Sequence, residues 1–213
     1  MLREHGDSPE SVGWCAANQA KRFAALTEGW DLSKSILDVG SGLAHLYDWL
    51  TDHADGKAIR YRGVDLLEEY VKAANIRLGS RLTQQLDAEV DLLPECDYAV
   101  ASGLFNVKLG DYGNRNQKLL SNVVANMLAS ARIGVSFDCL LDTHPYRIDR
   151  QFYYRYAWLS EIFQDIARYH KSSVNLTDAG LPGNMIVRIS KQPKEAEHAD
   201  HRHISEVRRE DSR

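Results

Sequence analysis

The sequence is poor in the features that define several protein classes. Its three cysteines, Cys15, Cys96 and Cys139, are widely spaced and odd in number, which argues against a disulfide framework or a zinc module. It has no apolar run near the roughly 18–20 residues that cross a bilayer. Its first residues, MLREHGDSPES, lack the apolar segment of a secretory signal. These absences predict a cytoplasmic protein with no membrane partner.

The sequence also has no excess of basic residues. Lys and Arg number 26 against 30 Asp and Glu, a formal net charge of −4, which argues against nucleic acid as the main partner. The 213 residues, 44% of them hydrophobic, suit one soluble α/β domain. Residues 191–213 mix acidic and basic side chains with few aliphatic ones, so they are expected to form a flexible tail. Its histidines, His198, His201 and His203, are expected to be solvated rather than metal ligands.

Apolar spacing predicts helices that alternate with strands. We expect helices at residues 9–28, 43–53, 68–78, 117–131 and 156–166. We expect strands at residues 35–39, 59–66, 82–86, 97–102, 133–139, 169–176 and 184–190. No helix separates the last two strands, which predicts a mainly parallel sheet with an antiparallel hairpin at its edge. Residues 1–30 would form an N-terminal helical cap, in which Trp14 serves the core or covers a ligand, and residues 31–190 the main domain.

The sharpest local signal is the stretch DVGSG at residues 38–42, between a predicted strand and a predicted helix. Gly40 and Gly42 allow a tight turn and let a ligand approach the backbone closely. The helix that follows would point free N–H groups at an anionic group of that ligand. Asp65 ends the next predicted strand, as in nucleotide-binding α/β domains.

Two classes of nucleotide cofactor compete for this loop. A dinucleotide dehydrogenase wants a third glycine three residues after the second, where this sequence has His45. Asp38 would also stand close to a pyrophosphate, which is a poor electrostatic match. A cofactor with an ammonium or a sulfonium suits this acid better, so the dinucleotide interpretation is less favoured.

Four motifs in order resemble the class I S-adenosylmethionine-dependent methyltransferases. They are ILDVGSG (36–42), YRGVDL (61–66), Asp87-Ala88 and DYAVASGLFN (97–106). The resemblance covers roughly residues 9–190. It implies a three-layer Rossmann-like fold, with a seven-stranded, mostly parallel sheet whose last strand is antiparallel.

The resemblance also implies a role for each matching residue. Those expected to contact S-adenosylmethionine are Asp38 at its amino group, Gly40, Ser41 and Gly42 at its methionine part, Asp65 at the ribose hydroxyls, Leu66, Asp87 and Ala88 at the adenine, and Ser102, Gly103 and Phe105 between methyl donor and acceptor. Two plainer interpretations remain open. Asp65 could only cap the next helix, and Asp87 could only be a loop acid.

The loop after the fifth strand, residues 138–154, is the expected acceptor pocket, because ligands sit beyond the carboxyl ends of the strands. His144 is the candidate general base, oriented by Asp138 or Asp142. Tyr112, Tyr153 and Tyr154 are candidates to line or bind the acceptor, and Tyr112 and Tyr153 are the next catalytic candidates if His144 is not the base. The same loop would suit docking of a neighbouring subunit, so a homodimer is left open.

The sequence favours a small-molecule oxygen or nitrogen acceptor. It has no Asn-Pro-Pro-Tyr-like tetrapeptide after the fourth strand, which argues against adenine or glutamine amino-methylases. It has no Pro-Cys dipeptide, which argues against a cytosine-ring methylase. The alternative is a protein that binds S-adenosylmethionine for non-methylating chemistry or for a non-catalytic, regulatory role.

Overall fold

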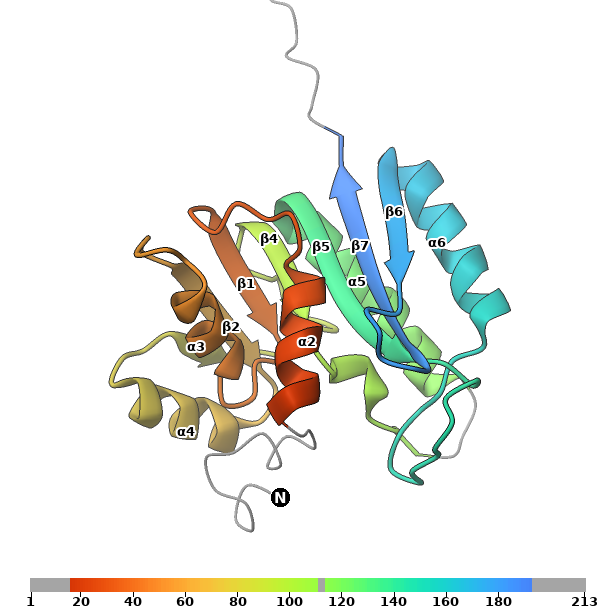
Figure 1. Ribbon diagram of the computed structural model, residues 1–213, viewed down its shortest axis with the longest axis horizontal. Helices are drawn as coiled ribbons and strands as arrows, with labels where there is room; N and C mark the ends of the chain where they lie inside the picture. The colour runs from red at the N-terminus through yellow and green to blue at the C-terminus, as the bar shows by residue number, and fades with distance from the viewer. Residues whose placement is uncertain (1–15, 111–113, 193–213) are drawn as a thin grey trace, which may run out of the picture.

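The computed structural model describes residues 16–110 and 114–192 of the chain. Strands and helices alternate in this part (Figure 1). In order they are α2 (Ala16–Leu26), β1 (Ser35–Val39), α3 (His45–Asp52), β2 (Arg60–Asp65), α4 (Glu68–Leu78), β3 (Thr83–Gln85), β4 (Cys96–Ala101), the 3₁₀ turn η2 (Leu104–Asn106), α5 (Arg115–Ser130), β5 (Ala131–Leu140), α6 (Tyr156–His170), β6 (Ser172–Thr177) and β7 (Asn184–Lys191). The predictions for Trp14, Cys15, Tyr112 and the histidines of the tail lie outside the described residues.

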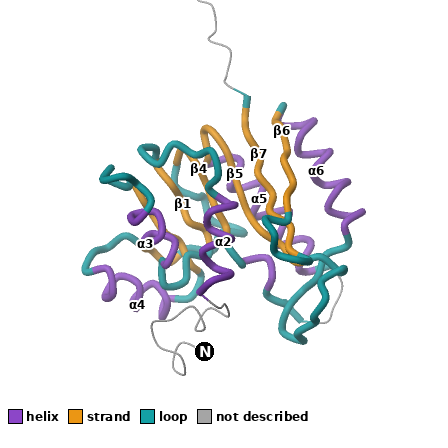
Figure 2. Tube along the Cα trace, in the orientation of Figure 1, coloured by secondary structure: helices purple, strands orange, loops and turns teal. Residues whose placement is uncertain are grey.

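The strands form one seven-stranded sheet in the order β3-β2-β1-β4-β5-β7-β6 (Figure 2). Strands β1 to β5 pair in parallel, and β7 runs antiparallel to both β5 and β6. The predicted mostly parallel sheet with an antiparallel last strand is therefore confirmed.

Helices cover both faces of the sheet, which gives the predicted three layers (Figure 1). On one face, α2, α3 and α4 contribute Phe23, Leu46 and Ala74 to a cluster that contains Ile36 of β1. On the other face, α5 and α6 pack on a second cluster around Phe137 of β5. No helix in the described part of the chain is long and apolar enough to cross a membrane.

Two boundaries near the end of the fold differ from the prediction. Helix α6 continues to His170, so β6 begins at Ser172 rather than at residue 169. The helix ends where Lys171 adopts a left-handed conformation (φ 47°), an ending that β-propensity alone could not reveal. Strand β7 includes Lys191, whose ammonium donates to the carbonyls of Leu128 and Ala131. This residue is therefore part of the sheet and not of the tail.

The connection between β3 and β4, residues 86–95, contains no helix. Its side chains Leu86, Ala88 and Leu93 pack on the cluster beneath α5. Strand β3 itself has only three residues and lies at the edge of the sheet. The side-chain amide of Asn75 in α4 donates to Thr83 O at 2.9 Å and accepts from Thr83 N at 3.0 Å.

The turn before β7 offers a matched pair of glycines for a stability test. Both are left-handed, Gly180 at φ +67° and Gly183 at φ +72°. A Cβ at Gly180 would meet nothing within 4 Å, whereas one at Gly183 would lie 2.4 Å from His144 Cα. We expect Gly180→Ala to cost about 1–2 kcal/mol of backbone strain, and Gly183→Ala to cost clearly more, as measured by denaturant unfolding. Equal losses would contradict the close packing of His144 on this turn.

Candidate active site

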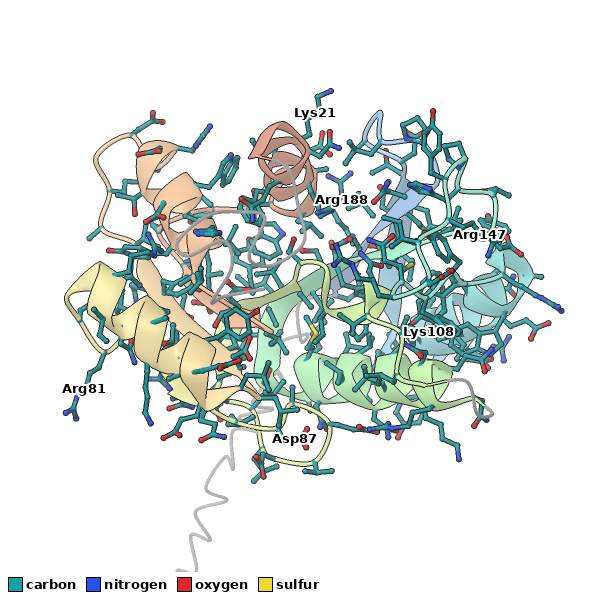
Figure 3. The ribbon with its side chains drawn as sticks, turned by 90° about the horizontal axis from the view of Figure 1, so that it is seen from below. Lys21, Arg81, Asp87, Lys108, Arg147 and Arg188 are labelled. Atoms are coloured by element: carbon teal, nitrogen blue, oxygen red, sulfur yellow. The ribbon has the colours of Figure 1, made fainter. Side chains whose placement is uncertain are left out.

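The carboxyl ends of β1, β2, β4 and β5 meet at one edge of the sheet, which Figure 3 views from below. Ligands of open α/β sheets bind at this edge. The candidate residues that the structure describes lie on segments that follow one of these strands or β3, or at the end of such a strand. The sheet topology therefore places these candidate residues, which are far apart in the sequence, at the same edge of the sheet.

The loop after β1 has an alternating left-handed backbone. Gly40, Gly42 and Ala44 have φ values of 73°, 53° and 60°, and the N–H groups of Gly40 and Ser41 both donate to Val64 O, at 2.8 and 3.0 Å. A Cβ at Gly40 would lie only 3.1 Å from Cδ1 of Leu104. Glycine at this position thus allows the segment after β4 to pack directly on the loop.

Arg77 of α4 stabilises the end of this loop. Its guanidinium donates to Leu43 O at 2.8 and 3.1 Å and to Ala44 O at 3.2 Å, and it pairs with Asp48 at 2.6 Å. These bonds occupy carbonyl oxygens beside Ala44, a residue that adopts a left-handed conformation without being glycine. The sequence analysis missed Arg77, because no pattern in the neighbouring residues indicates that an arginine will donate hydrogen bonds to a loop 34 residues earlier in the chain.

Asp65 connects the loop to the end of β2. Its Oδ2 accepts the N–H of Gly42 at 2.8 Å, and its Oδ1 accepts the N–H of Leu67 at 2.9 Å. Burial raises the pKa of this carboxyl, against the lowering effect of the two N–H groups. Each oxygen can accept a further hydrogen bond. The side chain therefore holds local structure, as the plainer interpretation expected, and still has room to bind hydroxyl groups.

An apolar surface lies beside this carboxylate. Leu66 and Leu67 follow it directly and are 57% and 48% exposed. Three N–H groups of the glycine loop, by contrast, are already bonded within the protein: those of Gly40, Ser41 and Gly42. The free N–H groups expected for an anionic ligand were those of the helix that follows, and the loop residues Gly40, Ser41 and Gly42 add none to them.

Asp38 is buried near the loop and accepts a hydrogen bond from the hydroxyl of Tyr61 at 2.7 Å. Burial, with a smaller contribution from the charge of Asp65, raises the pKa of Asp38 to about 7 despite that hydrogen bond. A cation that approached this carboxyl would favour its ionised form. The group is thus poised to lose a proton when an ammonium binds near it.

The end of β4 is held by Asp138 of β5, whose partners were not foreseen. Its Oδ1 accepts the N–H of Gly103 at 2.6 Å, and its Oδ2 accepts the side-chain amide of Asn106 at 2.8 Å. Arg22 of α2 reaches the same Oδ2 at 3.3 Å, and the two charged side chains are 2% and 0% exposed. Asp138 makes none of these bonds to His144, so the suggestion that it orients this histidine is wrong.

Two aromatic candidates belong to the core. Phe105 is fully buried and packs edge to face on Phe137 at 5.3 Å between ring centroids. Tyr154 is also buried, and its hydroxyl donates to the carbonyls of Phe105 and Asn116 at 3.2 and 3.3 Å. Both side chains are buried, whereas the sequence prediction placed them where they would contact donor or acceptor. Ser102 and Gly103, which precede them, are partly exposed.

His144 and Tyr153 lie together on the irregular loop after β5, with ring centroids 5.8 Å apart. Nδ1 of His144 lies 2.5 Å from Tyr146 O, and no described residue is bonded to its Nε2. The hydroxyl of Tyr153 donates to the side chain of Gln151 at 2.9 Å and accepts the N–H of Ile148 at 2.9 Å. The N–H of Tyr146 lies 3.1 Å from the same Nδ1. Nε2 is a proton acceptor in the tautomer in which Nδ1 donates to Tyr146 O, and it carries the proton in the tautomer in which Nδ1 accepts that N–H.

Asp87 lies on the β3–β4 connection, below the sheet in the view of Figure 3. Its Oδ1 accepts the N–H of Glu89 at 2.9 Å. Glu89 in turn pairs with Arg115 of α5 at 2.6 and 2.5 Å. The turn that carries Asp87 and Ala88 is thereby fixed to α5, which the weak strand signal in this region could not predict.

Comparisons with known proteins agree on one group of relatives. No protein-family model matches the chain. It is 34% identical over 149 residues, 69% of this chain and 87% of the relative, to a Mycobacterium tuberculosis protein named "Putative methyltransferase Rv1506c". The magnesium protoporphyrin IX methyltransferase of Synechocystis PCC 6803, solved with bound SAH, has a TM-score of 0.58 at 14% identity, covering 89% of this chain and 92% of that one.

A second solved structure, human N-acetylserotonin methyltransferase in complex with SAM, has a TM-score of 0.55 at 13% identity. The match covers 80% of this chain and 51% of that one. At such identities the two solved structures bear on the fold alone. Both solved structures have the same fold as this chain.

The raised pKa of Asp38 predicts how stability changes with pH. A carboxyl that titrates near 7 in the folded chain and near 3.8 when unfolded takes up a proton on folding between these values. The free energy of unfolding should therefore fall as the pH rises from about 4 to about 7. Urea unfolding across this range should show a shallower fall for Asp38→Asn than for the wild type. Identical pH profiles of the two proteins would contradict the assignment.

Proposed function

The chain belongs to the class I S-adenosylmethionine-dependent methyltransferase superfamily, and on this premise we propose that it methylates an oxygen or nitrogen atom of a small-molecule acceptor. The observation that carries the proposal is the position of Asp65. It lies at the end of β2, bonded to the glycine loop on one side and followed by exposed leucines on the other. The two solved relatives named above act on small molecules according to their names, which supports an acceptor of this class.

The residues at the carboxyl edge fit S-adenosylmethionine. Asp65 has acceptor capacity left for two ribose hydroxyls, and Leu66 offers the adenine an exposed apolar face. The buried Asp38 would hold the amino group and become ionised as it does so. The remaining proposed contacts are Gly40, Ser41 and Gly42 at the methionine part and Asp87 and Ala88 at the adenine.

The bound cofactor supplies a methyl group activated by a sulfonium, so the protein has to align the acceptor and exclude water. Ser102 and Gly103, at the end of β4, would border the methyl group, and Asp138 fixes the backbone at Gly103. The side chain of Phe105 takes no part in this role, because it is buried in the core.

We assign to His144 the role of the general base that removes the acceptor's proton. Its Nε2 makes no hydrogen bond to any residue that the structure describes, and the adjacent Tyr153 can bind an acceptor hydroxyl beside it. Asp142 precedes His144 by two residues and is exposed. Tyr112, outside the described residues, remains a candidate from the sequence.

The cofactor assignment predicts that Asp65→Ala binds S-adenosylhomocysteine about 10- to 100-fold more weakly than the wild type, as measured by calorimetry. Losing a charged acceptor of two hydroxyls costs about 1.5–3 kcal/mol. Asp52→Ala, which removes an exposed carboxylate from the end of α3, is the matched control and should bind normally. Melting curves of both variants separate lost binding from lost folding. Unchanged affinity of a folded Asp65→Ala protein would refute the assigned role.

The activity is tested with labelled S-adenosylmethionine and an extract of small metabolites. Mass spectrometry should reveal a product that is heavier than its precursor by the mass of one CH₂ group. With that acceptor, His144→Ala should turn over about 10²- to 10⁴-fold more slowly while its affinity for S-adenosylhomocysteine is unchanged.

His53→Ala, in which a histidine outside the acceptor loop is removed, serves as the control and should keep full turnover. Wild-type turnover by His144→Ala would rule out the assigned base. A product that carries an aminocarboxypropyl group would replace methylation by another use of the same cofactor. Cofactor binding without any product would favour a regulatory role.

A further inference from the structure

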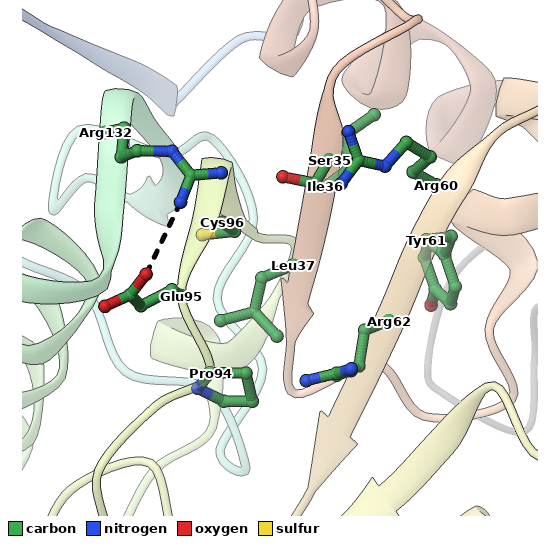
Figure 4. Close-up of a pocket in the computed structure, with 10 residues that line it drawn as sticks. All are labelled: Ser35, Ile36, Leu37, Arg60, Tyr61, Arg62, Pro94, Glu95, Cys96 and Arg132. Atoms are coloured by element: carbon green, nitrogen blue, oxygen red, sulfur yellow. Dashed lines mark ion pairs between the residues drawn. The ribbon is translucent and has the colours of Figure 1, made fainter.

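A pocket of about 380 Å³ opens at the amino ends of the strands, at the edge of the sheet opposite the proposed active site (Figure 4). Arg60 and Arg62 of β2 extend across β1 toward Pro94 and Arg132 on the other side. Leu37 lies between them. Nothing in the methyl-transfer proposal uses this pocket.

The pocket exists because the sheet lacks a covering helix there. Strands with helices on both faces are normally apolar throughout, whereas β2 reads RYRGVD with its arginines exposed and Val64 buried on the same face. The connection between β3 and β4, which has no helix, packs on the carboxyl half of this face through Leu86, Ala88 and Leu93. Its amino half is left open.

The charges in the pocket are unbalanced. Arg132 is committed to Asp97 at 3.0 Å and to Glu95 at 3.5 Å. Although burial raises the pKa of Asp97, hydrogen bonds from Ser35 and Arg132 outweigh it and lower that pKa to about 2, so this carboxylate stays charged and paired. Arg60 and Arg62 form no hydrogen bond or ion pair with any residue that the structure describes. Two guanidinium groups therefore line the pocket without an ion-pair partner, and the three arginines exceed the two carboxylates, Glu95 and Asp97, by one positive charge.

We propose that this pocket binds a small phosphorylated molecule. Arg60 and Arg62 are two residues apart on one face of β2, about 7 Å along the strand, so their flexible side chains can converge on one phosphate group. Planar guanidinium groups bind phosphate oxygens in pairs, and two of them match a dianion. The apolar floor at Leu37 and the ring of Pro94 would contact the uncharged part of the ligand.

The size of the pocket favours a small molecule over a macromolecule. Its volume lies within the range of small-molecule sites, roughly 300–1,000 Å³. It is also separate from the proposed cofactor site, because Arg62 precedes Asp65 by three residues, about 10 Å along β2. Binding at either site can therefore be measured with the other intact.

The test is calorimetry of the full chain at low salt with glucose 6-phosphate as the probe and glucose as its uncharged counterpart. We expect the wild type to bind only the phosphate ester. Arg62→Ala and the double variant R60A/R62A should each weaken this binding by tenfold or more. Arg62→Lys keeps the charge but loses the paired N–H donors of the guanidinium group. Its affinity for glucose 6-phosphate should lie between those of the wild type and Arg62→Ala.

Arg81→Ala is the matched control. This exposed arginine points away from the body of the protein beyond α4 (Figure 3), and its removal changes the net charge equally. It should leave glucose 6-phosphate binding unchanged. R60A/R62A should retain the wild-type affinity for S-adenosylhomocysteine, which shows that the variant is folded.

Several outcomes would overturn the proposal. They are no binding of glucose 6-phosphate, equal binding by wild type and R60A/R62A, and an equal loss in Arg81→Ala. Binding of citrate in place of glucose 6-phosphate would exclude phosphate as the recognised group. Concentration-dependent dimers that R60A/R62A abolishes, without any heat from glucose 6-phosphate, would instead assign the open face to a second copy of the chain.

Discussion

A buried ion pair determines how the parts of this fold meet at the proposed active site. Asp138 lies at the carboxyl end of β5, and its oxygens bind Arg22 of α2, the backbone of Gly103 and the side chain of Asn106. A charge in the interior is tolerated only with such partners, and loss of either member leaves the other uncompensated. The position of α2 and the turn after β4 are therefore set together. Through Leu104, that turn also contacts the glycine loop at Gly40.

Much of the fold could be predicted because its signals are local. The apolar run before the glycines predicted β1 with its observed bounds, and apolar spacing over residues 68–78 predicted α4. Asp65 likewise ends β2 at the loop, as expected. Local patterns could not reveal Arg22 or Arg77, because an arginine's partner is chosen by tertiary packing.

The errors within the site have a related cause. A resemblance assigns a residue to a position along a strand or loop, but it does not give the direction of the side chain. In DYAVASGLFN, the left-handed Gly103 and the 3₁₀ turn after it direct Phe105 into the core, while Ser102 stays partly exposed. Tyr154 was assigned from its place on the loop after the fifth strand, which does not give the direction of a side chain either. Its hydroxyl donates to backbone carbonyls inside the protein.

The short strand β3 has a consequence for how these molecules behave toward one another. An edge strand with free N–H and C=O groups is a template on which a strand of another chain can add, which leads to aggregation. Here Asn75 occupies both the N–H and the carbonyl of Thr83 with its own side-chain amide, and only two further residues of β3 follow. An incoming strand would have to displace that amide and would gain few hydrogen bonds in return. The addition of strands from other molecules at this edge is therefore disfavoured, although the connection to β4 contains no helix that could cover it.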